Sequence, residues 1–162
     1  NAETDLYQRL GDNGADVNRR NSDGESALMI AGDRNIPEGV RYLIGKMADL
    51  NLKNNDGRTV LMLTVDRKNM DIARQLVDAG ADLNAADNEG NTALHMAVTD
   101  DQDFVEYLVG KGANVNAING KGQTPIMLAT AQGMWETVEF LKQNGAVEED
   151  LDAYLEQLGE SD

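Results

Sequence analysis

Apolar and polar positions along this chain recur with a fixed period. A pair such as Asp-Gly, followed by a small polar residue and a short apolar run, begins at residue 23 and returns at 56, 89 and 121, at spacings of 33, 33 and 32 residues. A second landmark, Gly-Ala-Asp-Val-Asn at residues 14–18, returns in the same register. Two landmarks that hold one period of this length indicate a repeat architecture, so we predict a solenoid of stacked units.

Each unit is predicted to contain two helices and a hairpin. A hydroxyl residue precedes each apolar run, where its oxygen can accept a hydrogen bond from the first turn of a helix. These predicted caps are Ser26, Thr59, Thr92 and Thr124. A second helix follows with apolar residues at helical spacing, and a glycine such as Gly80 ends it. The segment up to the next tip is too short for a helix and is predicted to be an extended hairpin.

These units resemble the ankyrin repeat, which has a period of 33 residues and the signature Thr-Pro-Leu-His-x-Ala. Residues 92–97 keep the histidine of that signature, and Thr124-Pro125 keeps its proline. The resemblance covers nearly all of the chain and implies an all-α repeat solenoid of helix-turn-helix units with projecting β-hairpin loops. Methionine replaces the histidine at residues 29, 62 and 127, and Met47 replaces a helix-ending glycine. A left-handed Met47 is sterically unfavourable, so that corner is predicted to be either strained or shaped differently.

We predict one ankyrin repeat domain over residues 1–162. Its parts are an N-terminal half repeat (3–21), repeat 1 (22–54), repeat 2 (55–87), repeat 3 (88–119), repeat 4 (120–146) and a C-terminal capping helix (147–162). The shorter third period is explained by one residue missing between Ala97 and Phe104. Two interpretations of the start stay open: residues 3–12 form a one-helix cap, or part of the array lies upstream.

Composition limits the classes of function. Hydrophobic residues make up 41% and charged residues 27%, which is typical of a soluble folded protein. The absence of cysteine excludes disulfides, thiolate zinc sites and cysteine nucleophiles. A net charge of −15 repels phosphate backbones and anionic lipids, so neither nucleic acid nor a membrane is an expected partner. We expect a monomer without cofactors.

The compartment stays open. The chain begins with Asn1 rather than Met, so we expect that something upstream was removed. Cytoplasm is favoured, and the periplasm or secretion applies if a signal peptide preceded Asn1.

Three features are candidates for chemistry. His95 is the only histidine, and it lacks partners for catalysis, so a structural role is favoured. Asp100, Asp101 and Asp103 gather three carboxylates, but their turn is too short for a calcium loop, so a solvated helix start is favoured. Trp135, the only tryptophan, is predicted to pack rather than to form a binding hot spot.

The family resemblance implies a binding site for another protein. In ankyrin repeats, the hairpin tips and the exposed side of the first helix of each unit form a concave groove. The partner-binding residues implied here are Asp23, Glu25, Asp33, Arg34, Asp56, Arg58, Asp66, Arg67, Glu89, Asn91, Thr99, Asp100, Lys121, Gln123 and Gln132. Asp66, Arg67, Glu89, Asn91 and Asp100 are the central ones. The repeated Asp-Arg step is either a row of surface salt bridges, which contributes little, or alternating charge presented to a partner.

The charge distribution leaves several functions open. Between Arg74 and Lys111 there are eight acidic residues and no lysine or arginine, and residues 148–162 add seven acids. Such a field attracts a basic partner, or serves solubility alone. The first hypothesis is a non-enzymatic protein-binding module. The alternatives are an acidic inhibitor or immunity-type protein that masks a basic partner, a metal-dependent protein using the Asp100–Asp103 turn, and a scaffold without a ligand.

Overall fold

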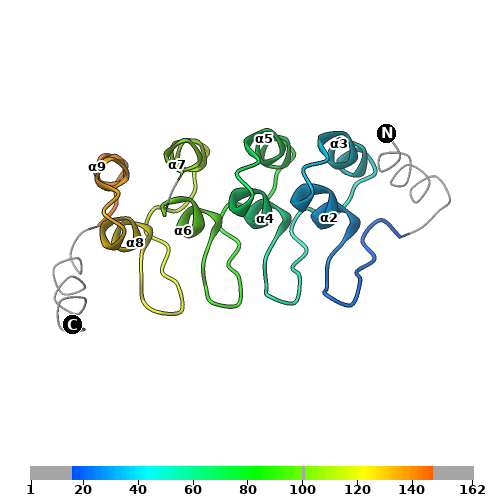
Figure 1. Ribbon diagram of the computed structural model, residues 1–162, viewed down its shortest axis with the longest axis horizontal. Helices are drawn as coiled ribbons and strands as arrows, with labels where there is room; N and C mark the ends of the chain where they lie inside the picture. Colours follow the sequence, from blue (N-terminus) through cyan, green and yellow to red (C-terminus); the bar gives the residue numbers. More distant parts are fainter. Residues whose placement is uncertain (1–15, 100, 148–162) are drawn as a thin grey trace.

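The described residues form two parallel layers of short helices with loops that project from one layer (Figure 1). The computed structural model describes residues 16–99 and 101–147. Asp100, most of the predicted N-terminal half repeat and the predicted capping helix beyond Val147 lie outside these ranges.

Each repeat contributes one helix to each layer. The inner helices, next to the loops, are α2 (Ala27–Asp33), α4 (Val60–Asp66), α6 (Ala93–Ala97) and α8 (Pro125–Ala131). The outer helices are α3 (Pro37–Gly45), α5 (Met70–Asp78), α7 (Gln102–Gly110) and α9 (Trp135–Gln143). The predicted all-α repeat solenoid is confirmed.

The inner helices begin where the hydroxyl residues predicted. Ser26, Thr59, Thr92 and Thr124 are their N-cap residues. The Ser26 hydroxyl accepts from the Met29 N–H at 3.3 Å. This bond satisfies one of the N–H groups that the first helical turn leaves without a backbone partner.

The turn between the two helices differs in repeat 3. In the other repeats it contains a residue with positive φ, namely Asn35 (55°), Lys68 (56°) and Gly133 (69°). In repeat 3, α6 has only five residues, and the Asp101 carboxylate caps α7 by accepting from the Phe104 N–H at 3.1 Å. The outer helix begins 9 residues after the inner helix in repeat 3 (93 to 102) and 10 residues after it in the other repeats (such as 60 to 70), which agrees with the predicted missing residue.

Met47 takes the left-handed conformation of the glycine that it replaces. Its φ is 60°, and its side chain is 85% exposed. Of the two predicted alternatives, the structure therefore has the strained corner.

The core lies between the two layers and continues from repeat to repeat. One cluster of buried side chains joins repeats 1 and 2 and includes Leu28, Val40 and Ile72. A second joins repeats 2, 3 and 4 and includes Leu61 and Phe104. Helices α4 and α5 contribute to both clusters, so repeat 2 couples the two ends of the described array.

The projecting loops differ from the predicted β-hairpins. The described residues contain no strand, and only one isolated bridge, between Arg20 and Ser26. Two backbone bonds close each loop, such as Asn54 N–H to Arg58 C=O at 2.9 Å and Gly57 N–H to Asn54 C=O at 3.0 Å. The other backbone N–H groups at the tip donate to a side chain or to the loop of the preceding repeat. Too few N–H groups therefore remain for the ladder of hydrogen bonds that a pair of strands requires.

The prediction that Trp135 is a packing residue is wrong. Trp135 is the first residue of α9, and 66% of its surface is exposed. Trp135 begins the last outer helix among the described residues, and no described helix follows α9 to cover the indole.

Candidate functional site

One side chain organises the tip of each projecting loop. In repeat 2, the Asn54 side-chain oxygen accepts from the N–H groups of Asp56 at 3.0 Å and Arg58 at 2.9 Å. The equivalent residues in the other repeats make the same pair of bonds; they are Asn21, Asp87 and Asn119. Short side chains with a carbonyl or carboxylate oxygen favour such turns, because they accept from nearby backbone donors. The predicted tip residues therefore lie at the tips.

Backbone bonds between neighbouring loops hold the tips in a row. The N–H of Asn88 donates to the C=O of Asp56 at 3.0 Å, and that of Gly120 donates to the C=O of Glu89 at 2.7 Å. At the base of the loops, asparagine side chains make equivalent bonds; the Asn84 oxygen accepts from the Asn114 N–H at 2.8 Å. These bonds fix the spacing of side chains along the row.

A cavity of about 380 Å³ opens between the tips of repeats 2 and 3, and we call it the tip cleft. Its lining residues are Asp56, Arg58, Asp87, Asn88 and Glu89. Three carboxylates therefore face one guanidinium. The Arg58 guanidinium donates to Asp66 at the end of α4. Because Asp66 already compensates this positive charge, Arg58 neutralises the three carboxylates of the cleft only in part. The tip cleft is consequently a negatively charged site.

A second ion pair links the inner helices of neighbouring repeats. Arg67 Nε donates to Asp33 Oδ1 at 2.7 Å, and this hydrogen bond raises the pKa of Arg67. Asp33, Asp66 and Arg67 therefore already have partners on this surface. This geometry agrees with the interpretation of the repeated Asp-Arg step as a row of surface salt bridges. Asp33 and Asp66 each accept a hydrogen bond from an arginine on the same surface.

The structure brings some predicted site residues together and assigns others to the scaffold. Asp56, Arg58, Asp66 and Glu89 gather at the tip cleft and its edge. Several others are held by internal hydrogen bonds; these are Glu25, Asn91, Thr99 and Gln123. Asp23, Arg34, Lys121 and Gln132 are exposed, and Asp100 lies outside the described residues.

Asp87 was missing from the predicted site. Its carboxylate accepts hydrogen bonds from the N–H groups of Glu89 and Asn91 in its own tip, and it also lines the tip cleft. Asp87 occupies the repeat position that Asn54 occupies in repeat 2. The sequence could have identified it, because an aspartate at this position adds a negative charge where the neighbouring repeats have a neutral amide.

His95 has a structural role. Its Nδ1 accepts from the Thr92 N–H at 3.2 Å, and its Nε2 lies 3.1 Å from the Gln123 C=O in the next repeat, where it donates. Both ring nitrogens are therefore engaged, and the side chain is only 2% exposed. In repeat 4 the Met127 sulfur takes the place of Nδ1, 3.5 Å from the Thr124 N–H.

This geometry predicts a pH-dependent stability. Burial lowers the pKa of His95 below its ordinary value of 6.5, so the unfolded chain takes up a proton at a higher pH than the folded chain. The free energy of unfolding should therefore fall as the pH is lowered from about 7.5 to about 5.5. Replacing His95 with Met, which repeats 1, 2 and 4 carry, should remove most of this dependence. Urea unfolding of the parent and of the His95→Met variant at both pH values measures this difference. An equal loss of unfolding free energy in the two proteins would contradict the prediction.

Neither a metal site nor a membrane span is found in the part of the chain that the structure describes. No three His, Asp or Glu side chains there lie close enough together to hold a metal ion. The Asp101 carboxylate caps α7. None of the helices described is both long and apolar enough to cross a bilayer.

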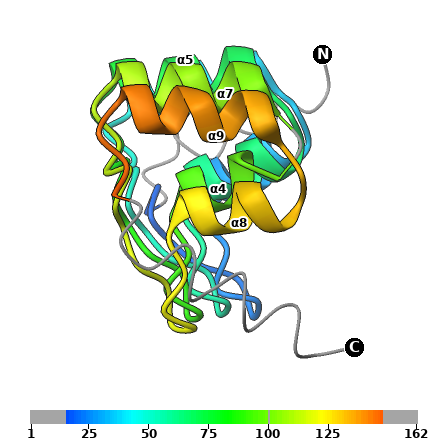
Figure 2. The same ribbon diagram turned by 90° about the vertical axis from the view of Figure 1, so that its left-hand side faces the viewer.

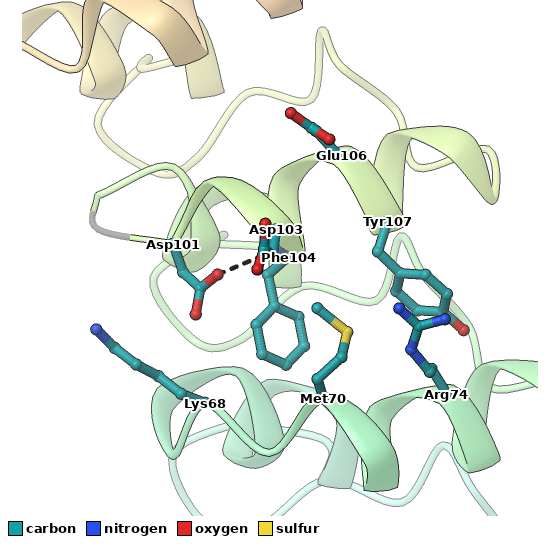
Figure 3. Close-up of a pocket in the computed structure, with 8 residues that line it drawn as sticks. All are labelled: Lys68, Met70, Arg74, Asp101, Asp103, Phe104, Glu106 and Tyr107. Carbon is teal, nitrogen blue, oxygen red and sulfur yellow. Dashed lines mark hydrogen bonds between the residues drawn. The ribbon is translucent and has the colours of Figure 1, made fainter.

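The outer layer carries a second type of cavity. A groove of about 550 Å³ between α5 and α7 has Lys68, Met70 and Arg74 on one side (Figure 3). Asp101 and Asp103 lie on the other side, with the Tyr107 ring 4.9 Å from the Arg74 guanidinium. Cations and carboxylates thus face each other across this groove.

The repeats of this chain are similar to those of a known protein family. A family model described as "Ankyrin repeats (3 copies)" matches residues 1–87, 28–119 and 85–154. No match was found among curated proteins.

Proposed function

Because the chain belongs to the ankyrin repeat family, we propose that it is a non-enzymatic module that binds a partner protein with its hairpin tips and inner-helix ends. Ankyrin repeats are generally protein–protein interaction modules. The observation that carries the proposal is the tip cleft, because it places three carboxylates in a concave, solvent-accessible position. The hydrogen-bonded row of tips supports it as well, since a preorganised surface loses little entropy on binding.

The charge of the tip cleft specifies the class of partner. Asp56, Asp87 and Glu89 exceed the single positive charge of Arg58, which also has Asp66 as a partner. A lysine or arginine of the partner would form charge-assisted hydrogen bonds with these carboxylates. We therefore assign the tip cleft to a basic loop of the partner protein.

The experiment compares which proteins the immobilised chain retains from a lysate of its source. Asp56→Lys/Glu89→Lys reverses two carboxylates of the tip cleft. Its matched control, Glu38→Lys/Asp71→Lys, makes the same change of net charge at exposed positions in the first turns of α3 and α5. A partner bound at the tips should be retained by the parent and the control. Its affinity for the tip variant should fall about tenfold or more.

Two outcomes would contradict the proposal. Either the control loses the same proteins as the tip variant, which indicates that only net charge matters, or the tip variant retains the full set.

The acidic inhibitor hypothesis is a narrower form of the same function. It is favoured by the acidic tip cleft, since masking of a basic surface requires dense carboxylates. In that case the retained protein should be strongly basic, and its association rate should fall steeply between about 50 and 200 mM salt. Binding that changes little over this range would indicate an apolar contact instead.

A further inference from the structure

The most exposed aromatic side chain of the described residues lies on the outer layer, away from the hairpin tips (Figure 2). Trp135 begins α9, and Gln102 occupies the same place at the start of α7. The residue two before Trp135 is Gly133, and a Cβ added there would lie 4.0 Å from the indole nitrogen. The indole thus turns back toward the Gly133 backbone and keeps 66% of the residue's surface in water.

Trp135 lines two cavities. The larger, about 500 Å³, runs between α7 and α9, and we call it the α7–α9 groove. Its lining includes Gln102, Glu106, Trp135, Glu136, Glu139 and Phe140. The smaller cavity, about 380 Å³, lies on the Gly133 side of the indole.

One hydrogen bond links the two helices that form the α7–α9 groove, and a second lies within α7. The Thr137 hydroxyl of α9 donates to the Gln102 side-chain oxygen of α7 at 2.5 Å. The amide nitrogen of Gln102 donates to Glu106 Oε1 at 2.9 Å. Gln102 is therefore fixed between the helices, and the Glu106 carboxylate is held at the edge of the groove.

The α7–α9 groove differs in charge from the α5–α7 groove beside it. Lys68 and Arg74 line the α5–α7 groove opposite its carboxylates. The residues that line the α7–α9 groove include Glu106, Glu136 and Glu139, and none of the lining residues within the described part of the chain is a lysine or arginine. Figure 3 shows Glu106 pointing away from Met70 and Arg74, toward the other side of α7. The same architecture thus gives one groove of mixed charge and one groove whose described lining contains carboxylates without a lysine or arginine.

We propose that the α7–α9 groove binds a lysine-rich segment of a partner protein, with a lysine ammonium over the Trp135 indole and beside Glu136 and Glu139. A cation over an indole face is attracted by the ring, and carboxylates strengthen its binding through charge-assisted hydrogen bonds. The methylene stem of lysine would cover part of Phe140, which is only partly buried. A purely apolar segment fits poorly, because it would remove water from three carboxylates without replacing their hydrogen bonds.

This site is separate from the tip cleft. The outer helices lie on the side of the molecule away from the tips (Figure 2), so the two surfaces can be tested independently. Trp135 is the only tryptophan of the chain, and its emission therefore reports directly on the α7–α9 groove.

The first experiment is a fluorescence titration of the full chain with hexalysine. The control ligand is hexalysine acetylated on every side chain, which keeps the stems and removes the charges. We expect a saturable change in Trp135 emission with hexalysine and none with the acetylated peptide. An equal response to both peptides, or no response to either, would overturn the proposal.

Matched variants separate local binding from the general attraction of an acidic protein. Glu136→Gln/Glu139→Gln and Glu38→Gln/Asp71→Gln remove the same number of charges, the first pair in the groove and the second at exposed positions in the first turns of α3 and α5. The groove pair should weaken the emission response to hexalysine about tenfold, and the control pair should leave it within about twofold. Equal weakening by both pairs would overturn the proposal. Failure of the tip-cleft function would leave this comparison unaffected.

A second measurement tests the aromatic contact itself. The anisotropy of fluorescein-labelled hexalysine should show about fivefold weaker binding to Trp135→Leu than to the parent. Trp135 is exposed, so circular dichroism should show an unchanged fold. Unchanged affinity would remove the indole from the site and overturn the proposal.

Discussion

Replacement of Phe104 with alanine is expected to lower the free energy of unfolding by about 3–5 kcal/mol. The side chain is 1% exposed and belongs to the cluster of buried residues that joins repeats 2, 3 and 4. It extends from α7 toward Met70, the first residue of α5 (Figure 3). Truncation leaves a cavity at the interface of two repeats.

Denaturant unfolding, followed by far-UV circular dichroism and by Trp135 emission, measures this loss. The two signals should separate in the variant, because a solenoid is stabilised by contacts between neighbouring repeats. Trp135 would then report the early loss of repeat 4. The control is Phe140→Ala, since the only other phenylalanine is partly exposed and packs at the edge of the same cluster. A smaller loss for Phe104→Ala than for Phe140→Ala would contradict the assigned core.

Gly90→Ala should destabilise the chain considerably more than Gly122→Ala. Both glycines have positive φ, 81° and 76°, so alanine at either position incurs a penalty of about 1–2 kcal/mol. At Gly90 a Cβ would lie 2.6 Å from the Gly120 backbone nitrogen, whereas at Gly122 it would meet nothing within 4 Å. The collision would push two tips apart and break the bond from Gly120 to Glu89. We expect a further loss of about 1–3 kcal/mol from crowding and the broken bond.

Comparison of the two variants by urea unfolding isolates the contact between repeats. Hydrogen exchange at the Gly120 amide adds a local measurement, because this N–H should lose protection only in Gly90→Ala. Equal unfolding free energies for the two variants would mean that the tips are not held in the observed register. Gly90→Ala should also weaken partner binding at the tip cleft, which Asn88 and Glu89 line.

Much of the fold could be predicted because it depends on short-range interactions. The N-cap hydroxyls bond within three residues, as Ser26 does to Met29, so the starts of the inner helices follow from local sequence. The tip residues follow in the same way, because Asn54 bonds to N–H groups two and four residues away. Repetition of these local patterns at a 33-residue period then predicts the stacking of units.

The ion pairs between repeats and the tip cleft could not be predicted, because they depend on distances between side chains of different repeats. Asp33 and Arg67 belong to different repeats, and only the packed array shows that their side chains meet at 2.7 Å. The tip cleft needs the tips of two loops side by side. Side-chain lengths and rotamers decide such contacts, and the period of the sequence contains no information about them.

The sequence by itself therefore determined the repeat, the helix caps, the turns and the acidic character of the protein, because each follows from bonds between near neighbours or from composition. Only the tertiary structure decided which side chains are exposed and which charges are compensated. Trp135 and Met70 begin equivalent helices, yet only Met70 has a following outer helix, α7, packed beside it among the described residues. The physical reason is that the side chains of the neighbouring repeat decide whether a position is covered. The local sequence around that position does not determine its burial.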